Sequence, residues 1–210
     1  MSLADIRREY LGQPLSETDS DPNPFRQFER WFAQVRELEP DATEMVLATA
    51  TRDGRPSVRT VLLKGLDDRG FVFYTNYNSR KARELEATGR ASLLFTWRSL
   101  ERQVRIDGTV EKVSTAESDA YFATRPIESR WSVYASNQSE VVDSRETLEL
   151  LFNAARERFD EDVPRPDWWG GYRVIPDEFE FWQGRPSRLH DRLRYVRESN
   201  GSWRRDRLAP

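Results

Sequence analysis

The residue most able to do chemistry is the only histidine, His190, within the run Arg188-Leu-His-Asp-Arg192. Histidine is the side chain whose ordinary pKa, about 6.5, lies near physiological pH, so any imidazole acting as acid, base or orienting group must be this one. Its neighbouring arginines make the run a candidate anion site. The alternative is that Leu189 and Leu193 turn toward the core and leave His190 on the polar side of an ordinary element.

A second group of cations lies on the predicted strand 57–64. Its side chains alternate between two faces, Arg59, Val61 and Leu63 on one and Thr60, Leu62 and Lys64 on the other. Cations on a half-buried strand are costly unless they pair with carboxylates or bind an anion. Placement of Arg59 and Lys64 on the surface is the alternative.

A third group lies where a predicted strand passes into a predicted helix, with Ser79 as N-cap and Arg80 and Lys81 in the first turn. Cations oppose the helix dipole at that end, which favours anions. The arrangement is explained if a phosphate binds there to free main-chain N–H groups and to both side chains. A charged helix start in which Glu84 pairs with one of the two cations is the alternative.

A phenol, a guanidinium and a hydroxyl recur at intervals of four in Tyr121, Arg125 and Ser129. On one helical face all three would donate hydrogen bonds to one phosphate, but Pro126 disturbs that geometry. Neutral donors that suit the carbonyls and ring nitrogens of a heterocycle, or that satisfy ordinary surface and core positions, are Gln103, Gln138 and Ser139.

Composition limits the remaining chemistry. The 210 residues include no cysteine, which excludes disulfides, iron–sulfur clusters and thiolate zinc sites, and we expect no metal. Basic and acidic residues number 33 and 36, and the net charge of -3 predicts no general attraction to nucleic acid or anionic lipid. Because no run approaches the roughly 20 apolar residues of a membrane span and residues 1–7 lack a signal peptide's apolar stretch, we expect a cytoplasmic protein with no membrane partner.

The elements that must position these groups follow from periodicity. Residues 1–23 predict a flexible N-terminal segment and linker, and residues 24–210 a single domain. Helical spacing of apolar residues covers 25–38 and ends at Pro40. Further helix patterns cover 79–88, 115–124, 128–135 and 144–159. Strand patterns cover 45–51, 57–64, 71–75, 91–97, 102–113, 170–175, 178–182, 193–197 and 202–207.

Two separators, Arg52-Asp-Gly-Arg55 and Asp67-Asp-Arg-Gly70, predict hairpin turns because Gly54 and Gly70 tolerate positive φ. Strands joined mostly by hairpins, with helices inserted late, predict an α+β fold that is mainly β. We expect an antiparallel barrel with flanking helices, and no Rossmann fold, because neither Gly-x-Gly-x-x-Gly nor a Walker motif occurs.

Several motifs, in order along nearly the whole chain, resemble the pyridoxine/pyridoxamine 5′-phosphate oxidase family. They are Arg59-Thr-Val-Leu-Leu-Lys64, Tyr74-Thr75, Ser79-Arg-Lys81, Leu100-Glu-Arg-Gln103-Val, Gln138-Ser139, Phe181-Trp-Gln-Gly184, Arg188-Leu-His-Asp-Arg192 and Asp206-Arg-Leu-Ala-Pro210. The resemblance implies a split β-barrel homodimer with FMN at the subunit interface. It implies oxidation of pyridoxamine 5′-phosphate and pyridoxine 5′-phosphate to pyridoxal 5′-phosphate, with O2 as acceptor, H2O2 as product and NH3 released from the amine.

The resemblance also implies roles for single residues. FMN contacts are implied at Arg59, Thr60, Val61, Leu62, Leu63, Lys64, Tyr74, Thr75, Arg80, Lys81, Gln103, Gln138, Ser139, Trp182 and Arg192. Substrate contacts are implied at Arg7, Tyr10, Lys64, Tyr121, Arg125, Ser129, Arg188 and His190. The last two would lie over the pyridine ring as catalytic residues, and residues 7–10 would close over the site. The expected mechanism is hydride transfer from substrate C4′ to flavin N5, followed by reoxidation of the flavin.

The chain departs from the family pattern at two places. It has Trp131-Ser-Val-Tyr134 where Ile-Gly-Ala-Trp is common, and Asn78 where glycine is frequent, and both departures bear on the shape of the pocket. Two other functions remain open. One is a related FMN oxidase of the phenazine-pathway type, against which Lys64 and the set around Arg125 argue. The other is a non-catalytic module that binds flavin or pyridoxal phosphate.

Overall fold

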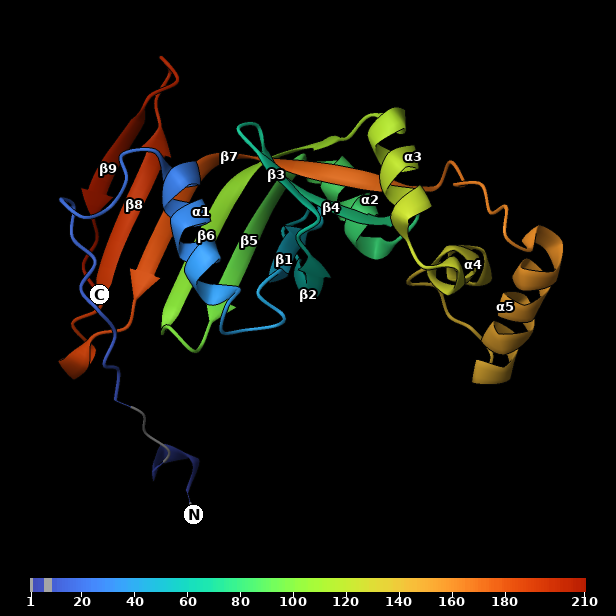
Figure 1. Ribbon diagram of the computed structural model, residues 1–210, viewed down its shortest axis with the longest axis horizontal. Coiled ribbons are helices and arrows are strands. Elements are labelled where there is room, and N and C mark those ends of the chain that lie inside the picture. Colours follow the sequence, from blue (N-terminus) through green and yellow to red (C-terminus); the bar gives the residue numbers. More distant parts are fainter. Residues whose placement is uncertain (1, 6–8) are drawn as a thin grey trace.

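A curled antiparallel sheet organises the structure, a computed structural model that describes residues 2–5 and 9–210 (Figure 1). The order along its main path is β2 (Pro56–Leu62), β1 (Glu44–Ala50), β5 (Arg90–Trp97), β6 (Arg102–Lys112), β7 (Trp169–Gln183), β4 (Gly70–Asn76) and β3 (Gly65–Asp67). Beyond this path, β8 (Asp191–Arg197) pairs with β7 and with β9 (Trp203–Arg207). The predicted mainly β fold of the α+β class is confirmed.

The predicted strands 170–175 and 178–182 form one strand, β7, of 15 residues. Its first half pairs with β4 and its second half with β8, while β6 pairs along both halves. The strand pattern of the sequence is interrupted at Pro176, which lies opposite Gly108 at a shift in the register between β6 and β7. A Cβ on Gly108 would lie 2.2 Å from the carbonyl oxygen of Ile175, so only glycine allows this approach. Proline in a sheet is tolerated at such irregularities, which explains why the prediction of two strands was wrong.

One helix, α1 (Pro24–Val35), covers part of the sheet with its apolar face. Asn23 caps it, because its side chain accepts a hydrogen bond from the N–H of Phe25. Phe28 is fully buried and packs edge-on against Phe71 and Phe95. The helix ends at Val35, so the predicted extension to residue 38 is wrong; Leu38 lies outside the helix and is 57% exposed.

The remaining helices lie at the predicted places, within one or two residues. They are α2 (Arg80–Thr88), α3 (Thr115–Thr124), α4 (Ile127–Ala135) and α5 (Arg145–Phe159). The N-caps of α2, α3 and α5 are Ser79, Ser114 and Ser144. Pro126 lies between α3 and α4. In Figure 1, α4 and α5 lie at one end of the molecule and β8 and β9 at the other.

The segment 9–23 is held against the body of the fold. Leu15 is buried in the main hydrophobic core. Arg205 donates a hydrogen bond to the carbonyl of Ser20 over 3.0 Å, and Arg207 forms an ion pair with Glu17 at 2.7 Å. The predicted flexibility of this segment stays a prediction. Arg7, expected to contact substrate, lies outside the described residues.

Two features are absent from the described ranges, 2–5 and 9–210. No helix within them is long and apolar enough to cross a membrane. Nor do three or more His, Cys, Asp or Glu side chains gather there in a group able to hold a metal ion.

Candidate functional site

A cavity of about 870 Å³ lies between β2, β4, the start of α2 and the α3–α4 region. Its size is within the range of roughly 300–1,000 Å³ that is usual for ligand pockets. Of the residues predicted from the sequence to bind FMN or substrate, the cavity is lined by Arg59, Thr60, Val61, Leu62, Lys64, Tyr74, Thr75, Arg80, Lys81, Tyr121, Arg125, Gln138 and Ser139. Leu63 instead has its side chain in the hydrophobic core.

Strand β2 supplies Arg59, which is held by several acceptors. Its guanidinium donates to the carbonyl of Leu47 at 3.0 Å and to the hydroxyls of Thr49 and Ser57, each at 2.6 Å. The same group lies 3.4 Å from a carboxylate oxygen of Glu84. Burial lowers the pKa of Arg59 and Glu84 opposes this effect. An arginine stays cationic under these conditions, so this end of the cavity carries a fixed positive charge.

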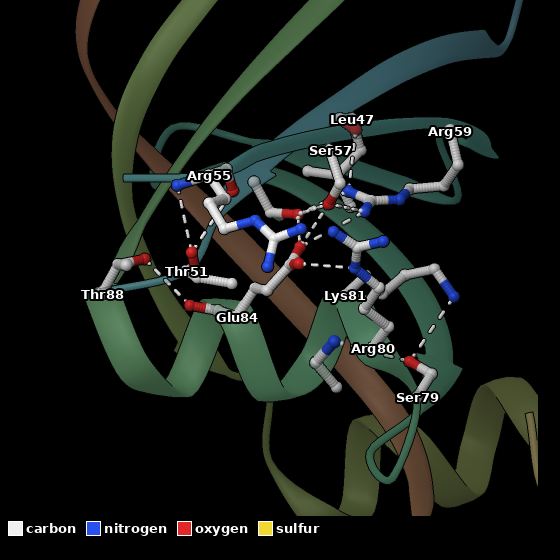
Figure 2. Close-up of polar contacts among 12 residues, drawn as sticks. Leu47, Thr51, Arg55, Ser57, Arg59, Ser79, Arg80, Lys81, Glu84 and Thr88 are labelled. Carbon is white, nitrogen blue, oxygen red and sulfur yellow. Dashed lines mark hydrogen bonds and ion pairs between the residues drawn. The ribbon is translucent and has the colours of Figure 1, made fainter. Parts of the chain in front are cut away.

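The start of α2 supplies two more cations (Figure 2). Ser79 caps the helix by accepting a hydrogen bond from the N–H of Ala82. Arg80 forms an ion pair with Glu84 at 2.8 Å, as one reading of the sequence expected. Lys81 instead donates to neutral groups, the Thr75 hydroxyl at 3.1 Å and the amide oxygen of Gln138 at 2.8 Å.

The electrostatics of this helix start fit a phosphate. Burial, and then the nearby charge of Arg59, lower the pKa of Lys81 to about 8. The shift reflects a buried ammonium group with one other cation nearby, and an anion beside it would stabilise its charge. The first turn of α2 also offers main-chain N–H groups, so the residues present match the phosphate end of FMN.

The end of α3 forms a second set of donors. The Tyr121 ring stacks on Tyr74 at 3.9 Å between centroids, and the Arg125 guanidinium lies 4.6 Å from the centre of the Trp169 ring. Arg125 also donates to the carbonyl of Ser129 at 2.8 Å. Burial raises the pKa of Tyr121 and lowers that of Arg125. Ser129 thus orients Arg125 through its main chain, and its hydroxyl is not part of the cavity lining.

Sequence reasoning missed several lining residues. Ser132 and Ser136 follow Ser129 at helical spacing, and that periodicity was a signal that could have found them. Trp169 reaches the cavity because β7 pairs it with Asn76 of β4, a register that the sequence does not reveal.

Of the residues that depart from the family pattern, two line the cavity and the others lie outside its lining. Ser132 and Val133 line the cavity. Trp131 donates to the carbonyl of Asp160, and Tyr134 donates to that of Pro164, each at 2.8 Å. These two aromatic residues therefore tie α4 to the end of α5 and the loop that follows. The N–H of Asn78 donates to the side chain of Asn76, within the turn before α2.

A second group of predicted residues within the described ranges lies around His190, namely Tyr10, Gln103, Trp182, Arg188 and Arg192. The His190 imidazole lies 4.6 Å from the Trp182 ring and 5.1 Å from the Tyr10 ring, between centroids. A Cβ on Gly184 would lie 2.4 Å from the Tyr10 ring, so the glycine lets the N-terminal segment approach this closely. Burial, and then Arg188, lower the pKa of His190.

Neighbours of this histidine carry strain and charge. Ser187 and Arg188 have φ values of 57° and 60°, a conformation that is unfavourable for residues other than glycine and that clusters at functional sites. Arg192 forms an ion pair with the buried Glu180 at 2.7 Å. Gln103 is paired with Trp182 across β6 and β7, which brings it to the same region.

Within one chain, the residues that line the cavity and the residues around His190 lie far apart. Thr75 pairs with Gly170 near the start of β7, whereas Gln103 pairs with Trp182 near its end. Twelve residues of strand, about 40 Å at roughly 3.3 Å per residue, separate these points. Figure 1 shows the same relationship, with α2 and α3 near one end of β7 and β8 at the other. The cavity and the surroundings of His190 are therefore separate within a chain.

Comparison with protein families gives two matches that together span most of the chain. A family model described as "Pyridoxamine 5'-phosphate oxidase" matches residues 32–159. A second, described as "Pyridoxine 5'-phosphate oxidase C-terminal dimerisation region", matches residues 169–210.

Relatives match over almost their full length. The pyridoxine/pyridoxamine 5′-phosphate oxidase of Rubrobacter xylanophilus is 59% identical over 212 residues, covering 99% of this chain and 96% of the relative. The Burkholderia multivorans protein of the same name is 56% identical, covering 100% and 99%.

Solved structures include PhzG from Burkholderia lata 383 in complex with tetrahydrophenazine-1-carboxylic acid. It matches with a TM-score of 0.87 at 35% identity, over 95% of this chain and 99% of PhzG. A pyridoxamine 5′-phosphate oxidase-related, FMN-binding protein from Nostoc punctiforme has a TM-score of 0.74 at 16% identity, over 90% of this chain and 100% of its own, and supports the fold alone.

Proposed function

Because the chain belongs to the pyridoxamine 5′-phosphate oxidase family, we propose that it oxidises pyridoxamine 5′-phosphate and pyridoxine 5′-phosphate to pyridoxal 5′-phosphate. FMN is the cofactor and O2 the electron acceptor in this proposal. The observation that supports it is a cavity lined by two sets of cationic and hydroxyl-bearing side chains, one at the start of α2 and one at the end of α3. Two sets of cations suit two phosphate monoesters, one on the cofactor and one on the substrate.

The cofactor's phosphate is assigned to Arg59, Arg80 and Lys81, with the first turn of α2 adding N–H donors. Thr75, Gln138 and Ser139 supply neutral polar groups in the same cavity. When bound, FMN would supply the redox chemistry, as acceptor of a hydride equivalent and donor of electrons to O2. The task of the protein is to bind, orient and neutralise.

The substrate's phosphate is assigned to Tyr121 and Arg125, with Lys64 nearby on the strand side. The stack of Arg125 on Trp169 holds the guanidinium plane in place, so less side-chain entropy is lost when a phosphate binds. Arg188 and His190 are assigned to the substrate ring, where they orient it toward the flavin.

This assignment requires a second copy of the chain. About 40 Å of β7 separates the two groups in one chain, and a homodimer would bring His190 of the partner subunit to the cavity. The match of residues 169–210 to a dimerisation region supports this arrangement, because those residues include β7, β8 and His190. In the proposal each of two cavities is completed by the other chain.

A related FMN oxidase of the phenazine-pathway type is the second candidate. The observation in its favour is the likeness to PhzG over nearly the whole chain. Lys64 and the donors around Arg125 favour a phosphorylated ring instead, and the proteins named pyridoxine/pyridoxamine 5′-phosphate oxidase are more similar in sequence.

One assay separates the candidates. The purified protein is examined for a flavin absorption spectrum, and aldehyde formation under air is followed with each of the two phosphorylated vitamers. Unphosphorylated pyridoxamine and tetrahydrophenazine-1-carboxylic acid serve as comparison substrates, and O2 consumption is followed for all four because oxidation of the phenazine compound forms no aldehyde. We expect turnover of the phosphorylated vitamers. Turnover of the phenazine compound alone would assign the second candidate, a yellow protein inert toward all four would be a binding module, and a colourless protein that gains nothing from added FMN would overturn the proposal.

A further inference from the structure

A buried carboxylate lies beside the proposed cofactor-phosphate site without lining the cavity. The side chain of Glu84, in the middle of α2, is only 4% exposed. Arg80 donates to one of its oxygens at 2.8 Å, and the hydroxyls of Thr49 and Ser57 donate to the other at 2.5 Å each. Figure 2 shows Arg59 and Arg80 converging on this carboxylate from β2 and from α2.

The carboxylate also sets the direction of the hydrogen bonds to Arg59. A hydroxyl has one proton to donate and lone pairs with which to accept. Because Thr49 and Ser57 give their protons to Glu84, their oxygens are left to accept from Arg59, at 2.6 Å each. Glu84 thus fixes one arginine directly and the other largely through two hydroxyls.

We propose that Glu84 is a positioning residue for the phosphate of the flavin cofactor, holding Arg59 and Arg80 in the geometry in which they bind it. The inference rests on the proposed function, because it takes FMN as the ligand. Glu84 accepts a hydrogen bond from Nε of Arg80. Among residues 2–5 and 9–210, the two terminal amino groups of the Arg80 guanidinium have no hydrogen-bond partner. That leaves this end of Arg80, a cavity-lining residue, available for a phosphate.

The ionisation state of Glu84 agrees with this role. Burial alone would raise its pKa, but the hydrogen bonds from Ser57 and Thr49, together with Arg80, hold the pKa at about 2. The group is therefore a carboxylate throughout the physiological pH range, and a permanent acceptor. Glutamine at this position would place an amide N–H₂ among the hydroxyls and reverse part of the network.

Charge and geometry predict opposite effects of removing the carboxylate. If Glu84 only neutralised the arginines, its loss would leave more positive charge and tighten the binding of a phosphate. If it positions them, its loss lets both guanidiniums move and weakens binding. The sign of the change in FMN affinity therefore separates the two roles.

The test compares FMN with riboflavin, which has the same ring and ribityl chain but no phosphate. Apoprotein is titrated with each flavin, and binding is measured by quenching of flavin fluorescence. For Glu84→Gln we expect FMN affinity to fall by about tenfold or more, the usual size of a lost charge-assisted contact, and riboflavin affinity to change by less than about twofold.

A matched control is Glu86→Gln on the same helix. Glu86 pairs with Lys112 at 2.7 Å, and its side chain is 49% exposed. The substitution Glu86→Gln removes the same charge at a residue that contacts neither arginine, so we expect both flavin affinities to stay at the wild-type values. Thermal unfolding of each apoprotein shows whether the variant is folded.

Unchanged or tighter FMN binding by Glu84→Gln would overturn the inference, and so would equal losses for FMN and riboflavin. If this variant does not fold, Thr49→Val decides, because it removes a hydroxyl link outside the cavity lining and keeps the carboxylate; a selective loss of FMN affinity is expected and no selective loss overturns the inference. Wild-type protein that prefers FMN to riboflavin but oxidises no vitamer would overturn the proposed function alone. Wild-type protein without that preference would overturn the inference.

Discussion

The main-chain N–H of Arg185 donates a hydrogen bond to Nδ1 of His190 over 3.1 Å. A nitrogen that accepts carries no proton, so the neutral imidazole has its proton on Nε2. The rings of Tyr10 and Trp182 contact the imidazole and hold its plane. His190 therefore presents a donor in a fixed direction, which suits a residue that orients a substrate ring.

The tautomer and pKa of His190 can be measured without assignment, because it is the only histidine. Two-bond ¹⁵N–¹H spectra should show a protonated Nε2 and a pKa below 6.5, since burial and then Arg188 disfavour the cation. Stability should fall as pH falls below 6.5, where the unfolded chain takes up the proton first, and level off below the folded pKa. Arg188→Ala should move the pKa back toward 6.5. A protonated Nδ1 at neutral pH would contradict this arrangement.

The lowered pKa of Lys81 predicts that FMN binding depends on pH. Its pKa is about 8 in the apoprotein because burial and Arg59 disfavour the charge, and a bound phosphate would raise it. FMN affinity should thus be constant just below pH 8 and fall by up to about tenfold per pH unit above it. Titration of apoprotein with FMN across this range measures the effect. Lys81→Arg stays charged and should remove the dependence; the same fall in that variant would assign it to another group.

Arg125 should act on substrate binding more than on the cofactor. Arg125→Ala removes the guanidinium that stacks on Trp169, and we expect KM for pyridoxamine 5′-phosphate to rise by about tenfold or more, with little change in FMN affinity. Arg125→Lys keeps the charge but not the planar fork and should be intermediate. An unchanged KM in the alanine variant would remove Arg125 from the substrate site.

Arg188 should matter for turnover and not for flavin retention. Its side chain is exposed in one chain, and its backbone is held at positive φ beside His190. For Arg188→Ala we expect kcat/KM to fall by about a hundredfold while FMN affinity stays near the wild-type value. The control is Arg197→Ala, because Arg197 is also an exposed arginine but lies at the end of β8. Equal losses of turnover and of flavin affinity would assign Arg188 to the flavin site or to folding.

The proposed dimer predicts complementation between two inactive variants. A heterodimer of Arg125→Ala and Arg188→Ala would contain one cavity in which both residues are intact, because they come from different chains. Coexpression in equal amounts should restore about a quarter of the wild-type activity, as random pairing makes half of the dimers mixed and one of two sites in each complete. No recovery would show that each site is built within one chain.

The sequence by itself predicted most of the elements and the local parts of the proposed site. Helix and strand periodicity located α2, α3, α4 and α5 almost to the residue. Ser79, Arg80 and Lys81 could be proposed as an anion site from the sequence, because a helix N-terminus is formed by adjacent residues. The order of motifs along the chain identified the family before any geometry was known.

Tertiary structure decided which of these parts meet. Continuity of β7 depends on a close approach between Gly108 and Ile175, and the role of Glu84 depends on β1, β2 and α2 packing around one carboxylate. The separation of His190 from the cavity likewise depends on the register of β7. Periodicity, capping and turn chemistry act over a few residues and can be read along a chain. Register and the sharing of a buried charge are set by partners far apart in sequence, and they exist only when the sheet has formed.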